Sequence, residues 1–524
     1  MSKFRPVTFA IISGCIFLIV IAVPYLFAAY TGGTEFAFTS FLLNPLDGNS
    51  YLAKMYQGRA GSWQFKLPFT ADPGEGAYLF LFYLSLGHLS RILALPNPVV
   101  FHAARLLGAA FLLWTLWSYF GALFEKNSRP HKAAFALSVF GAGVGWMLLP
   151  AGALPSDFWV AEAYPFLSSY TNPHFPISLG LMLWLLMPPL DSPLSARRMA
   201  ALGAASLILS LLSPFGVVIT SLVLGAELLF RFLQRSPHRA VLARLLLIAL
   251  PAAPALLYDL WIVRVHPALA VWDAQNLTPS PPLWDTLISL SPALLLTGVA
   301  AWRIFLSGKG ETDGKTAGSP EWRPLLLWVA ISLVMMYLPL GLQRRFMMGI
   351  YIPLSGLAAL GLEFLAGARA RRYRWLVIVV FAFALLTNLI LLAGSFVAAS
   401  THSPQVYLTR AERDALTWLD AHSAPDALIL AAPETGVFIP AHTGRRVLYG
   451  HPYETVHADA MEAAVTAFFD GSLTAAEMQD FLRAHGVDLI FYGPRERALG
   501  NISAPAGWQI VFQQDDVLIF QNDR

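Results

Sequence analysis

The chain has 524 residues, of which 56% are hydrophobic and only 13% are charged. Soluble domains carry roughly a quarter of charged residues, so this composition excludes an ordinary soluble protein and indicates a membrane protein. The net charge of +3 is too small to indicate a nucleic-acid partner. The single cysteine, Cys15, excludes an intrachain disulfide and a cysteine-built metal site.

Many apolar stretches are long enough for a helix to cross a bilayer, which takes about 20 residues. Clear examples are Val7–Tyr30, Trp284–Phe305 and Trp375–Ala398. The first of these is longer than the hydrophobic region of a signal peptide and follows Lys3 and Arg5. We therefore interpret it as an uncleaved first helix.

A polar segment, Thr31–Gly76, separates the first two apolar stretches. Its motif runs Asn-Pro-Leu-Asp-Gly-Asn-Ser from residue 44 and continues to Gly61-Ser62-Trp63 and Pro68. We expect Asp47 to lie in a turn before a short amphipathic helix. A carboxylate there can take a proton from an acceptor hydroxyl or bind a divalent cation. The alternative is that Asp47 caps the helix over Ser50–Gln57.

Three other charged residues of this segment are candidates as well. Lys54, in the same motif, is predicted to bind substrate. Asp72 and Glu75 are weaker candidates for the catalytic carboxylate, and Glu75 also for a metal ligand, because a carboxylate at the place of Glu75 also favours the N-terminus of the next helix.

The positions of lysine and arginine predict the topology, because cytoplasmic loops are enriched in them. With all basic clusters in the cytoplasm, the N-terminus is cytoplasmic, and Thr31–Gly76 and everything after Ser400 are extracytoplasmic. Ala77–Leu95 and Pro98–Phe124 cannot then both cross fully, and we expect Leu86–Leu95 to be interfacial or re-entrant. About eleven helices remain as crossings. The clusters are Lys3/Arg5, Lys126/Arg129/Lys132, Arg197/Arg198, Arg231/Arg235/Arg239/Arg244, Lys309/Lys315/Arg323 and Arg369/Arg371/Arg372/Arg374.

A second polar motif, Ser169–Pro176, directly precedes an apolar run. His174 lies between two prolines in a predicted external loop, where it can bind a metal or a phosphate oxygen. Asn172, two residues earlier, is predicted to bind substrate. The alternative is that these polar residues only cap the helix that follows.

A third motif places Arg344 and Arg345 in a short predicted external turn. Such arginines normally extend to the membrane interface. Positive charge is disfavoured on this side, however, and paired guanidinium groups can hold a phosphate or diphosphate bidentately. We therefore predict that the pair binds substrate.

The tail, Thr401–Arg524, has the composition of a soluble domain. Helices are predicted over Leu408–His422, His457–Phe469 and Thr474–His485, the last with Thr474 and Glu477 in a capping box. The predicted strands are Ala427–Ala431, Val487–Tyr492, Gln509–Gln513 and Val517–Gln521. We predict a transmembrane domain over residues 1–399 and an extracytoplasmic α/β domain over residues 400–524. Ser307–Pro320 resembles a linker.

This arrangement resembles the GT-C class of integral-membrane glycosyltransferases, which includes protein O-mannosyltransferases, aminoarabinose transferases and oligosaccharyltransferases. The matching features are an acidic residue in the first external loop (Asn44–Tyr51), a Gly-x-Trp…Pro stretch (Gly61–Pro68), many further helices and an extracytoplasmic C-terminal domain. The resemblance implies a polytopic helical membrane fold. It also implies that Asp47 is the catalytic base or a metal ligand, and that Arg344 and Arg345 hold the phosphate of a lipid donor.

One departure from the class concerns the metal. Many members have paired acidic residues in the first loop, whereas Asp47 is followed by Gly48 and Asn49. A divalent cation (Mg, Mn or Zn) held by Asp47, Glu75 and His174 therefore stays an open alternative to a metal-free site.

The resulting prediction is a multi-pass plasma-membrane glycosyltransferase. It would move a sugar from a polyprenyl-phosphate donor in the lipid bilayer to an unidentified extracytoplasmic acceptor. Two alternatives stay open: a transporter or flippase in which the same loops line the substrate path, and a non-catalytic membrane receptor. Few spans carry the mid-membrane charges that transport paths use, with Glu227 and Asp259 as exceptions.

Overall fold

The computed structural model describes residues 6–307, 322–339 and 341–522. The predicted linker, Ser307–Pro320, falls almost wholly outside the described residues. The chain folds into two compact units. The first, which we call the helical unit, comprises Met1–Pro24, Ala103–Leu257 and Thr278–Ser395. The second, which we call the mixed unit, comprises Tyr25–His102, Tyr258–Leu277 and Phe396–Arg524.

Among the described residues, seven helices are long and apolar enough to cross a membrane. The protein is therefore a polytopic helical membrane protein, as predicted. The seven spans are formed by α1 (Pro6–Thr31), α4 (Asn97–Leu123), α5 (Arg129–Phe140) continued through the 3-10 helix η1 (Gly145–Ala151), α9 (Pro214–Leu233), α10 (Arg239–Val265), α15 (Tyr351–Ala366) with the preceding turn from Gln343, and α16 (Ala370–Ala384) together with α17 (Leu386–Ser400).

The number of spans is smaller than the predicted number of about eleven. Trp284–Phe305, expected as one helix, is divided into α12 (Leu283–Ser289) and α13 (Ala293–Ser307), which meet at an angle of 86° and make at most an eighth span. Two apolar helices, α7 (His174–Leu185) and α14 (Arg323–Met335), have only 12 and 13 residues. Counting apolar residues overestimated the spans because it does not detect where a helix breaks.

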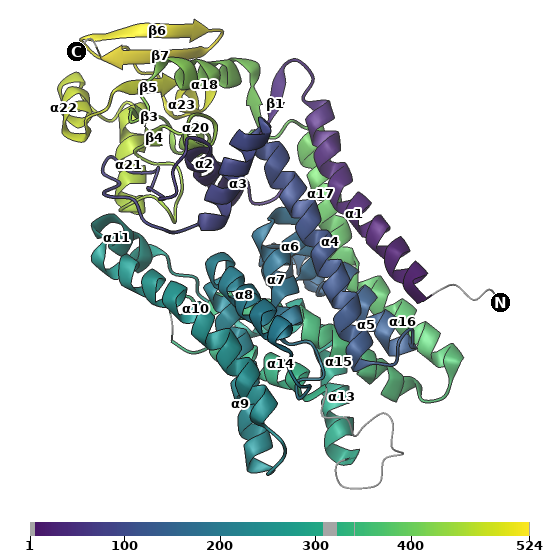
Figure 1. Ribbon diagram of the computed structural model, residues 1–524. Coiled ribbons are helices and arrows are strands. Elements are labelled where there is room, and N and C mark those ends of the chain that lie inside the picture. The colour runs from purple at the N-terminus through teal and green to yellow at the C-terminus, as the bar shows by residue number, and fades with distance from the viewer. Residues whose placement is uncertain (1–5, 308–321, 340, 523–524) are drawn as a thin grey trace. The chain divides into compact units, whose positions relative to one another are not determined.

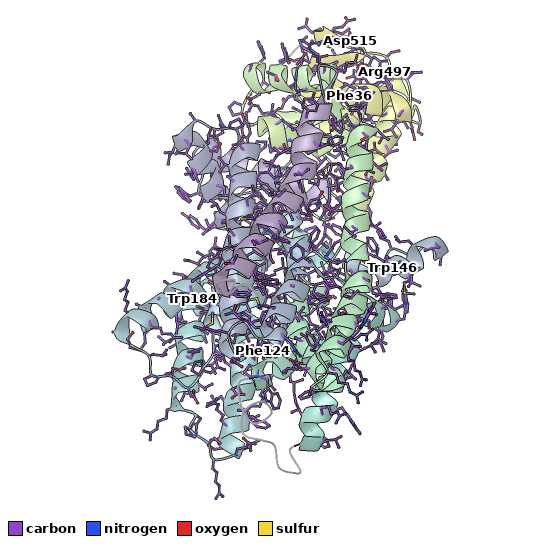
Figure 2. The ribbon with its side chains drawn as sticks, turned by 90° about the vertical axis from the view of Figure 1, so that its right-hand side faces the viewer. Phe36, Phe124, Trp146, Trp184, Arg497 and Asp515 are labelled. Carbon is purple, nitrogen blue, oxygen red and sulfur yellow. The ribbon has the colours of Figure 1, made fainter. Side chains whose placement is uncertain are left out.

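Further short elements complete the helical unit. The chain leaves α5 at Phe140 and enters η1, which carries Trp146 (labelled in Figure 2). The indole N–H of Trp146 donates to the carbonyl of Phe383 in α16 at 3.2 Å. The remaining elements are η2 (Ser156–Phe158), α6 (Pro165–Thr171), α8 (Ala196–Leu212) and η4 (Gln343–Met347).

Glu227, one of the two expected mid-membrane charges, has a structural role. Its carboxylate is fully buried in α9 and is paired with Arg231 at 2.6 Å and with Arg323 at 2.5 Å. Burying a carboxylate is tolerated when cations neutralise it. The pairs join α9 to the start of α14, so this charge gives no support to a transport path.

The tail in the mixed unit has the predicted α/β character. Its five-stranded mixed sheet has the order β4-β3-β5-β7-β6 (Figure 1), with β4, β3 and β5 parallel and β7 antiparallel to both β5 and β6. The strands are β3 (Leu428–Leu430), β4 (Arg446–Val447), β5 (Leu489–Tyr492), β6 (Trp508–Gln514) and β7 (Val517–Asn522).

Alternation along the strands gives the sheet two buried faces. Ile429 packs on one face with residues of α18 (Arg410–His422), whereas Leu428 packs on the other with residues of α21 (Ala458–Phe469). The predicted capping box is confirmed at the start of α22 (Ala475–His485), where Thr474 and Glu477 each bond the other's backbone. The other helices of this part are α19 (Pro433–Gly436), α20 (Phe438–Thr443) and α23 (Pro494–Leu499).

The tail does not stand alone in the mixed unit. Strand β1 (Phe36–Phe38), from the first polar segment, pairs antiparallel with β2 (Tyr407–Thr409). The same segment contributes α2 (Pro45–Arg59), which packs on α3 (Leu81–Leu93) and on α20. Residues 267–275 form α11 (Pro267–Gln275). The first polar segment and the tail are therefore parts of one compact structure.

Helix α3 settles which of the two uncertain stretches is too short to cross. Its 13 residues span about 20 Å at 1.5 Å per residue, whereas the hydrocarbon core is about 30 Å thick. It lies beside α2 (Figure 1), and the two helices approach through Gly58 and Gly87. A Cβ atom on Gly87 would lie 2.0 Å from the carbonyl oxygen of Met55, and one on Gly58 would lie 2.1 Å from that of Leu84.

We expect Gly87→Ala to destabilise the mixed unit by about 1–3 kcal/mol, because the methyl group meets rigid backbone and the two helices must separate. The measurement is the thermal unfolding midpoint of the purified protein in detergent. Gly225→Ala in α9 is the matched control, since no described atom beyond its chain neighbours and the local backbone of α9 lies within 4 Å of the added methyl group. It should leave the midpoint unchanged or raise it slightly. Equal midpoints for the two variants would contradict this account of the helix contact.

Candidate functional site

Asp47 lies inside the first turn of α2, not at its cap. The helix begins at Pro45, and the residue before it, Asn44, has a left-handed backbone (φ 52°) and makes no side-chain cap. The alternative role of Asp47 as the cap of a helix over Ser50–Gln57 is therefore wrong, because the helix starts earlier than the motif suggested. A carboxylate in the first turn still benefits from the positive end of the helix dipole.

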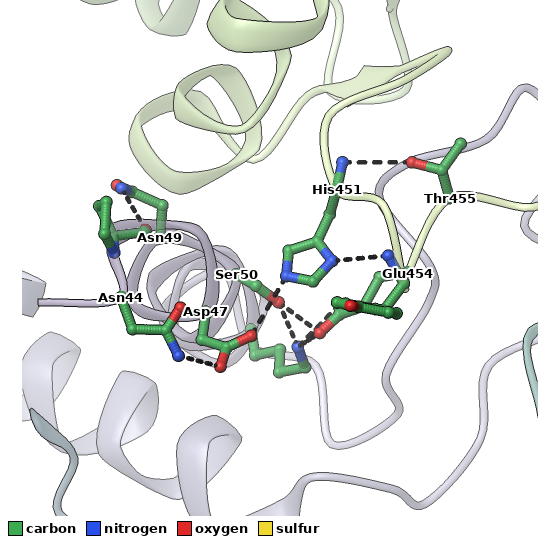
Figure 3. Close-up of polar contacts among 10 residues, drawn as sticks. Asn44, Asp47, Asn49, Ser50, His451, Glu454 and Thr455 are labelled. Atoms are coloured by element: carbon green, nitrogen blue, oxygen red, sulfur yellow. Dashed lines mark hydrogen bonds and ion pairs between the residues drawn. The ribbon is translucent and has the colours of Figure 1, made fainter. Parts of the chain in front are cut away.

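Both oxygens of the Asp47 carboxylate accept hydrogen bonds (Figure 3). The side-chain amide of Asn44 donates to Oδ2 at 2.5 Å, and Nε2 of His451 lies 3.3 Å from Oδ1. The side chain is 39% exposed, whereas His451 is 2% exposed. The site therefore presents an accessible carboxylate that is supported from behind by N–H donors, which is an arrangement suited to a general base.

The same face of α2 carries a second polar contact, one turn further along. Ser50 and Lys54 follow Asp47 at helical spacing and both meet Glu454. Ser50 Oγ donates to Glu454 Oε1 at 2.7 Å, and Lys54 Nζ donates to the two oxygens of Glu454 at 2.8 and 2.9 Å. Lys54 Nζ also donates to Ser50 Oγ at 2.5 Å.

The structure corrects the predicted role of Lys54 as a substrate ligand. Its side chain is 0% exposed, and its ammonium group lies 4.4 Å from the ring centroid of Phe80. A substrate could reach it only by breaking the pair with Glu454. Burial alone would raise the pKa of Glu454, but the charges of Lys54 and His451 and the hydrogen bonds from Lys54 and Ser50 keep this pKa below its usual value. The pair is therefore ionised at neutral pH and fixes the tail to α2.

Glu454 and His451 belong to a short loop of the tail, residues 450–455, that folds back on itself. The backbone N–H of His451 donates to Oγ1 of Thr455 at 3.2 Å, and the N–H of Thr455 donates to the carbonyl of His451 at 2.9 Å. The side-chain amide of Gln275, in α11, bonds the carbonyl of Thr455. The loop is thus held from within and from a neighbouring helix.

His451 and Glu454 were missed by the sequence interpretation. They lie about 400 positions from α2, in a loop between a predicted strand and a predicted helix, and nothing in the local pattern connects them to the first polar segment. The available signal was the run Gly450-His451-Pro452-Tyr453-Glu454, a turn with two chemically active side chains directly after a strand.

Glu75 lies in the same unit. Its side chain is exposed, and its backbone carbonyl accepts a hydrogen bond from Nε2 of His266 at 2.8 Å. Within the described ranges, no group of three or more histidine, cysteine, aspartate or glutamate residues is placed to hold a metal ion. The roles of Glu75 and His174 as metal ligands thus stay predictions.

A second site lies in the helical unit, around Glu162. This carboxylate is buried, and its Oε1 lies 3.3 Å from Nη1 of Arg345 and 3.8 Å from Nε of Arg344. Two guanidinium groups thus share one carboxylate, which leaves a net charge of +1. The side chain of Arg344 is 23% exposed and that of Arg345 is 34% exposed. The guanidinium of Arg344 lies 5.0 Å from the ring centroid of Trp159.

The backbone explains how this second site is held. The N–H of Arg344 donates to the carbonyl of Thr278 at 3.1 Å, and the N–H of Gly349 donates to the carbonyl of Glu162 at 2.8 Å. Nε of Arg344 is buried, and no hydrogen-bond partner for it is found in the part of the chain that the structure describes. The arrangement can bind an anion that brings further oxygen atoms. Glu162 was not among the predicted site residues, although it is one of two acidic residues in Ala151–Pro173, a segment that the charge pattern of the loops predicts to be external.

Asn172 and His174 also belong to the helical unit. Asn172 is buried and ends α6, whereas His174 is partly exposed and is the first residue of α7, with its ring 3.9 Å from that of Phe175. The N-cap of α7 is Pro173, and no side chain caps this helix, so the alternative role of these polar residues as its cap is not observed among the described residues. Their predicted roles as substrate ligands stay predictions.

Comparison with solved structures relates the whole architecture to known proteins. The archaeal oligosaccharyltransferase AglB from Archaeoglobus fulgidus, in complex with an inhibitory peptide and a dolichol-phosphate, is 14% identical with a TM-score of 0.51, over 91% of this chain and 69% of that one. The Archaeoglobus fulgidus oligosaccharyltransferase in complex with Zn and sulfate is 14% identical with a TM-score of 0.52, over 90% and 67%.

A bacterial protein matches over nearly the full length of both chains. ArnT from Cupriavidus metallidurans in the apo state is 12% identical with a TM-score of 0.51, over 96% of this chain and 97% of that one. No family model and no curated protein matches the sequence. At these identities the likeness is one of fold. The chain therefore has the fold of the GT-C class of integral-membrane glycosyltransferases, as the resemblance of its sequence predicted.

Proposed function

We propose that this protein is a membrane glycosyltransferase that moves a sugar from a polyprenyl-phosphate donor to a hydroxyl-bearing acceptor. The observation that carries the proposal is the Asp47 carboxylate, which is accessible, stands at the start of a helix and is supported by two N–H donors. The GT-C fold and the dolichol-phosphate bound by AglB support the class of donor.

In the proposed reaction, Asp47 accepts the proton of the acceptor hydroxyl. The oxygen attacks the anomeric carbon of the sugar, and the bond between that carbon and the phosphate oxygen breaks. The bonding electrons leave with the polyprenyl phosphate, so a single displacement inverts the configuration. General bases of this kind contribute about a hundredfold or more to the rate.

Arg344 and Arg345 are proposed to bind the donor's phosphate. They carry a surplus positive charge over Glu162, and the fork of a guanidinium group matches phosphate oxygens in pairs. The guanidinium groups would stabilise the negative charge that the phosphate gains as it leaves, which lowers the barrier.

The test is transfer of label from a tritiated polyprenyl-phosphate sugar, offered as separate hexose and pentose donors, to a detergent extract of membranes. Purified wild-type protein should move label out of the lipid-phosphate fraction and release polyprenyl phosphate. A transporter or a receptor would leave the donor intact. Label that stays on the donor with every sugar and extract offered would contradict the proposal.

The predicted divalent cation does not fit the residues around Asp47. The two carboxylate oxygens of Asp47 face N–H donors from Asn44 and His451, which repel a cation. The other ring nitrogen of His451, Nδ1, accepts a hydrogen bond from the backbone N–H of Tyr453. We therefore expect that EDTA treatment changes the transfer rate less than twofold. A tenfold loss that Mg, Mn or Zn restores would show that a metal takes part and that the polar contacts of Asp47 rearrange.

We also propose that the mixed unit is extracytoplasmic, with the N-terminus in the cytoplasm. The first polar segment and the tail share this unit, so cysteines at Gln64 and Gln405, both exposed, should react alike in a Cys15→Ser background. A membrane-impermeant maleimide should label both in intact cells. Labelling of both only after the cells are opened would reverse the orientation, and labelling of one alone would contradict the shared unit.

A further inference from the structure

We infer that His451 is a positioning residue for Asp47, acting as a neutral imidazole that donates its Nε2 proton to the carboxylate. The inference rests on the proposed function of Asp47 as a base, and it assigns part of the site to the tail. It depends on three features of the mixed unit: the tautomer of His451, the fixation of its ring, and the charges around it.

The tautomer follows from the second nitrogen of the ring. The backbone N–H of Tyr453 donates to Nδ1 of His451 at 3.1 Å, so Nδ1 must present its lone pair (Figure 3). In a neutral imidazole the proton is then on Nε2, which lies 3.3 Å from Oδ1 of Asp47. A doubly protonated ring would point an N–H at the N–H of Tyr453 and lose that bond.

The ring is fixed more firmly than a surface histidine. It is 2% exposed and lies 6.0 Å from the ring of Phe69, and its loop is closed by Thr455. Glu454, three residues further on, is bound by Lys54 and Ser50 of α2, the helix that carries Asp47. The loop and the Asp47 carboxylate are therefore both attached to α2. This shared attachment holds the donor, Nε2 of His451, next to the acceptor, Oδ1 of Asp47.

The carboxylates of Asp47 and Glu454 lie near His451 and favour a charged ring, whereas the bond that Nδ1 accepts from the N–H of Tyr453 favours the neutral ring. Glu454 is neutralised by Lys54, and α3 contributes Tyr83, whose pKa is raised by burial and by the nearby Tyr51 and Asp47, so that it stays neutral.

This arrangement has a specific consequence for the base. An N–H donor stabilises the charged form of a carboxylate and orients it. Because Nε2 already carries a proton and Nδ1 is occupied, His451 cannot receive the proton that Asp47 removes from the acceptor. His451 should therefore set the pH range over which Asp47 is ionised without relaying the proton itself.

The test titrates Asp47 directly by its reaction with a water-soluble carbodiimide, which modifies protonated carboxyl groups and is read by peptide mass spectrometry. In His451→Phe the midpoint of Asp47 modification should move to higher pH by about one unit, because an N–H bond to a charged group is lost. In His451→Gln, whose amide can replace the Nε2 donor, it should stay near the wild-type value.

Two controls accompany this measurement. The exposed Asp72, in the same segment, should keep its modification midpoint in every variant, and His422→Phe on α18 should shift neither residue. In the transfer assay, the acid limb of the pH–rate profile should move with the Asp47 midpoint in His451→Phe and be restored in His451→Gln.

Several results would overturn the inference. An unchanged Asp47 midpoint in His451→Phe would remove the donor role, and a shift in His451→Gln as large as that in His451→Phe would show that a charged imidazole is needed. The carbodiimide readout needs no turnover, so it tests His451 even if the proposed function fails. Conversely, wild-type turnover of Asp47→Asn would contradict the proposed function and leave the titration result intact.

Discussion

Asp47→Asn should lower the rate of sugar transfer by about a hundredfold or more, because the amide cannot accept the proton of the acceptor hydroxyl. The substitution keeps the shape of the side chain, and its amide oxygen can still accept the bond from His451. Stability should therefore change by only about 1 kcal/mol, through the lost charge at the helix N-terminus. The measurements are turnover of the labelled donor and the thermal unfolding midpoint of the same preparation.

The matched control is Asp72→Asn, an exposed carboxylate in the same polar segment. It should keep wild-type turnover, which separates the role of Asp47 from a general loss of negative charge. If Asp47→Asn turns over at the wild-type rate, Asp47 is not the base, and Asp72 and Glu75 become the next candidates. If Asp47→Asn loses both turnover and folding, the result reports on the structure of α2 instead, and Asp47→Glu would then be measured.

Substitution of the arginine pair should weaken binding of polyprenyl phosphate, and the loss should be larger when the charge is removed together with the paired hydrogen bonds. Arg344→Lys and Arg345→Lys keep the charge but lose the paired hydrogen bonds, and should each cost about tenfold in affinity. The double alanine variant should cost about a hundredfold or more. Glu162→Gln should have the opposite effect, because it removes the carboxylate that competes with phosphate for both guanidinium groups.

Binding of undecaprenyl phosphate to the detergent-solubilised protein, measured by native mass spectrometry, checks this series. The double variant Arg371→Ala/Arg372→Ala is the control, since it removes two adjacent exposed arginines from α16. Arginines that only anchor the protein at the interface would tolerate lysine and would not respond to Glu162→Gln. The double alanine variant also leaves Glu162 buried without a cation, so its unfolding midpoint must be measured before a loss of binding is assigned to phosphate.

The sequence alone determined the features that depend on local pattern. Apolar length identified a polytopic membrane protein. Alternation and capping residues located α18, α21 and α22 and the strands β3, β5, β6 and β7 of the tail, down to the capping box of Thr474 and Glu477, but not β2, β4, α19, α20 or α23. The motif around Asp47, together with the many apolar stretches and the soluble tail, indicated the class of fold. These features follow from the period of side chains along one segment, which a sequence displays directly.

The tertiary structure alone decided how distant segments combine. It placed Glu454 against Lys54, which turned a predicted substrate ligand into half of a buried ion pair, and it placed His451 behind Asp47. It also set Glu162 between Arg344 and Arg345 and broke one expected span into α12 and α13. Most of these contacts join residues that are more than a hundred positions apart, so the spacing of side chains along one segment does not indicate them. They arise only when packing brings the segments together, because a buried charge must then find its partner in space.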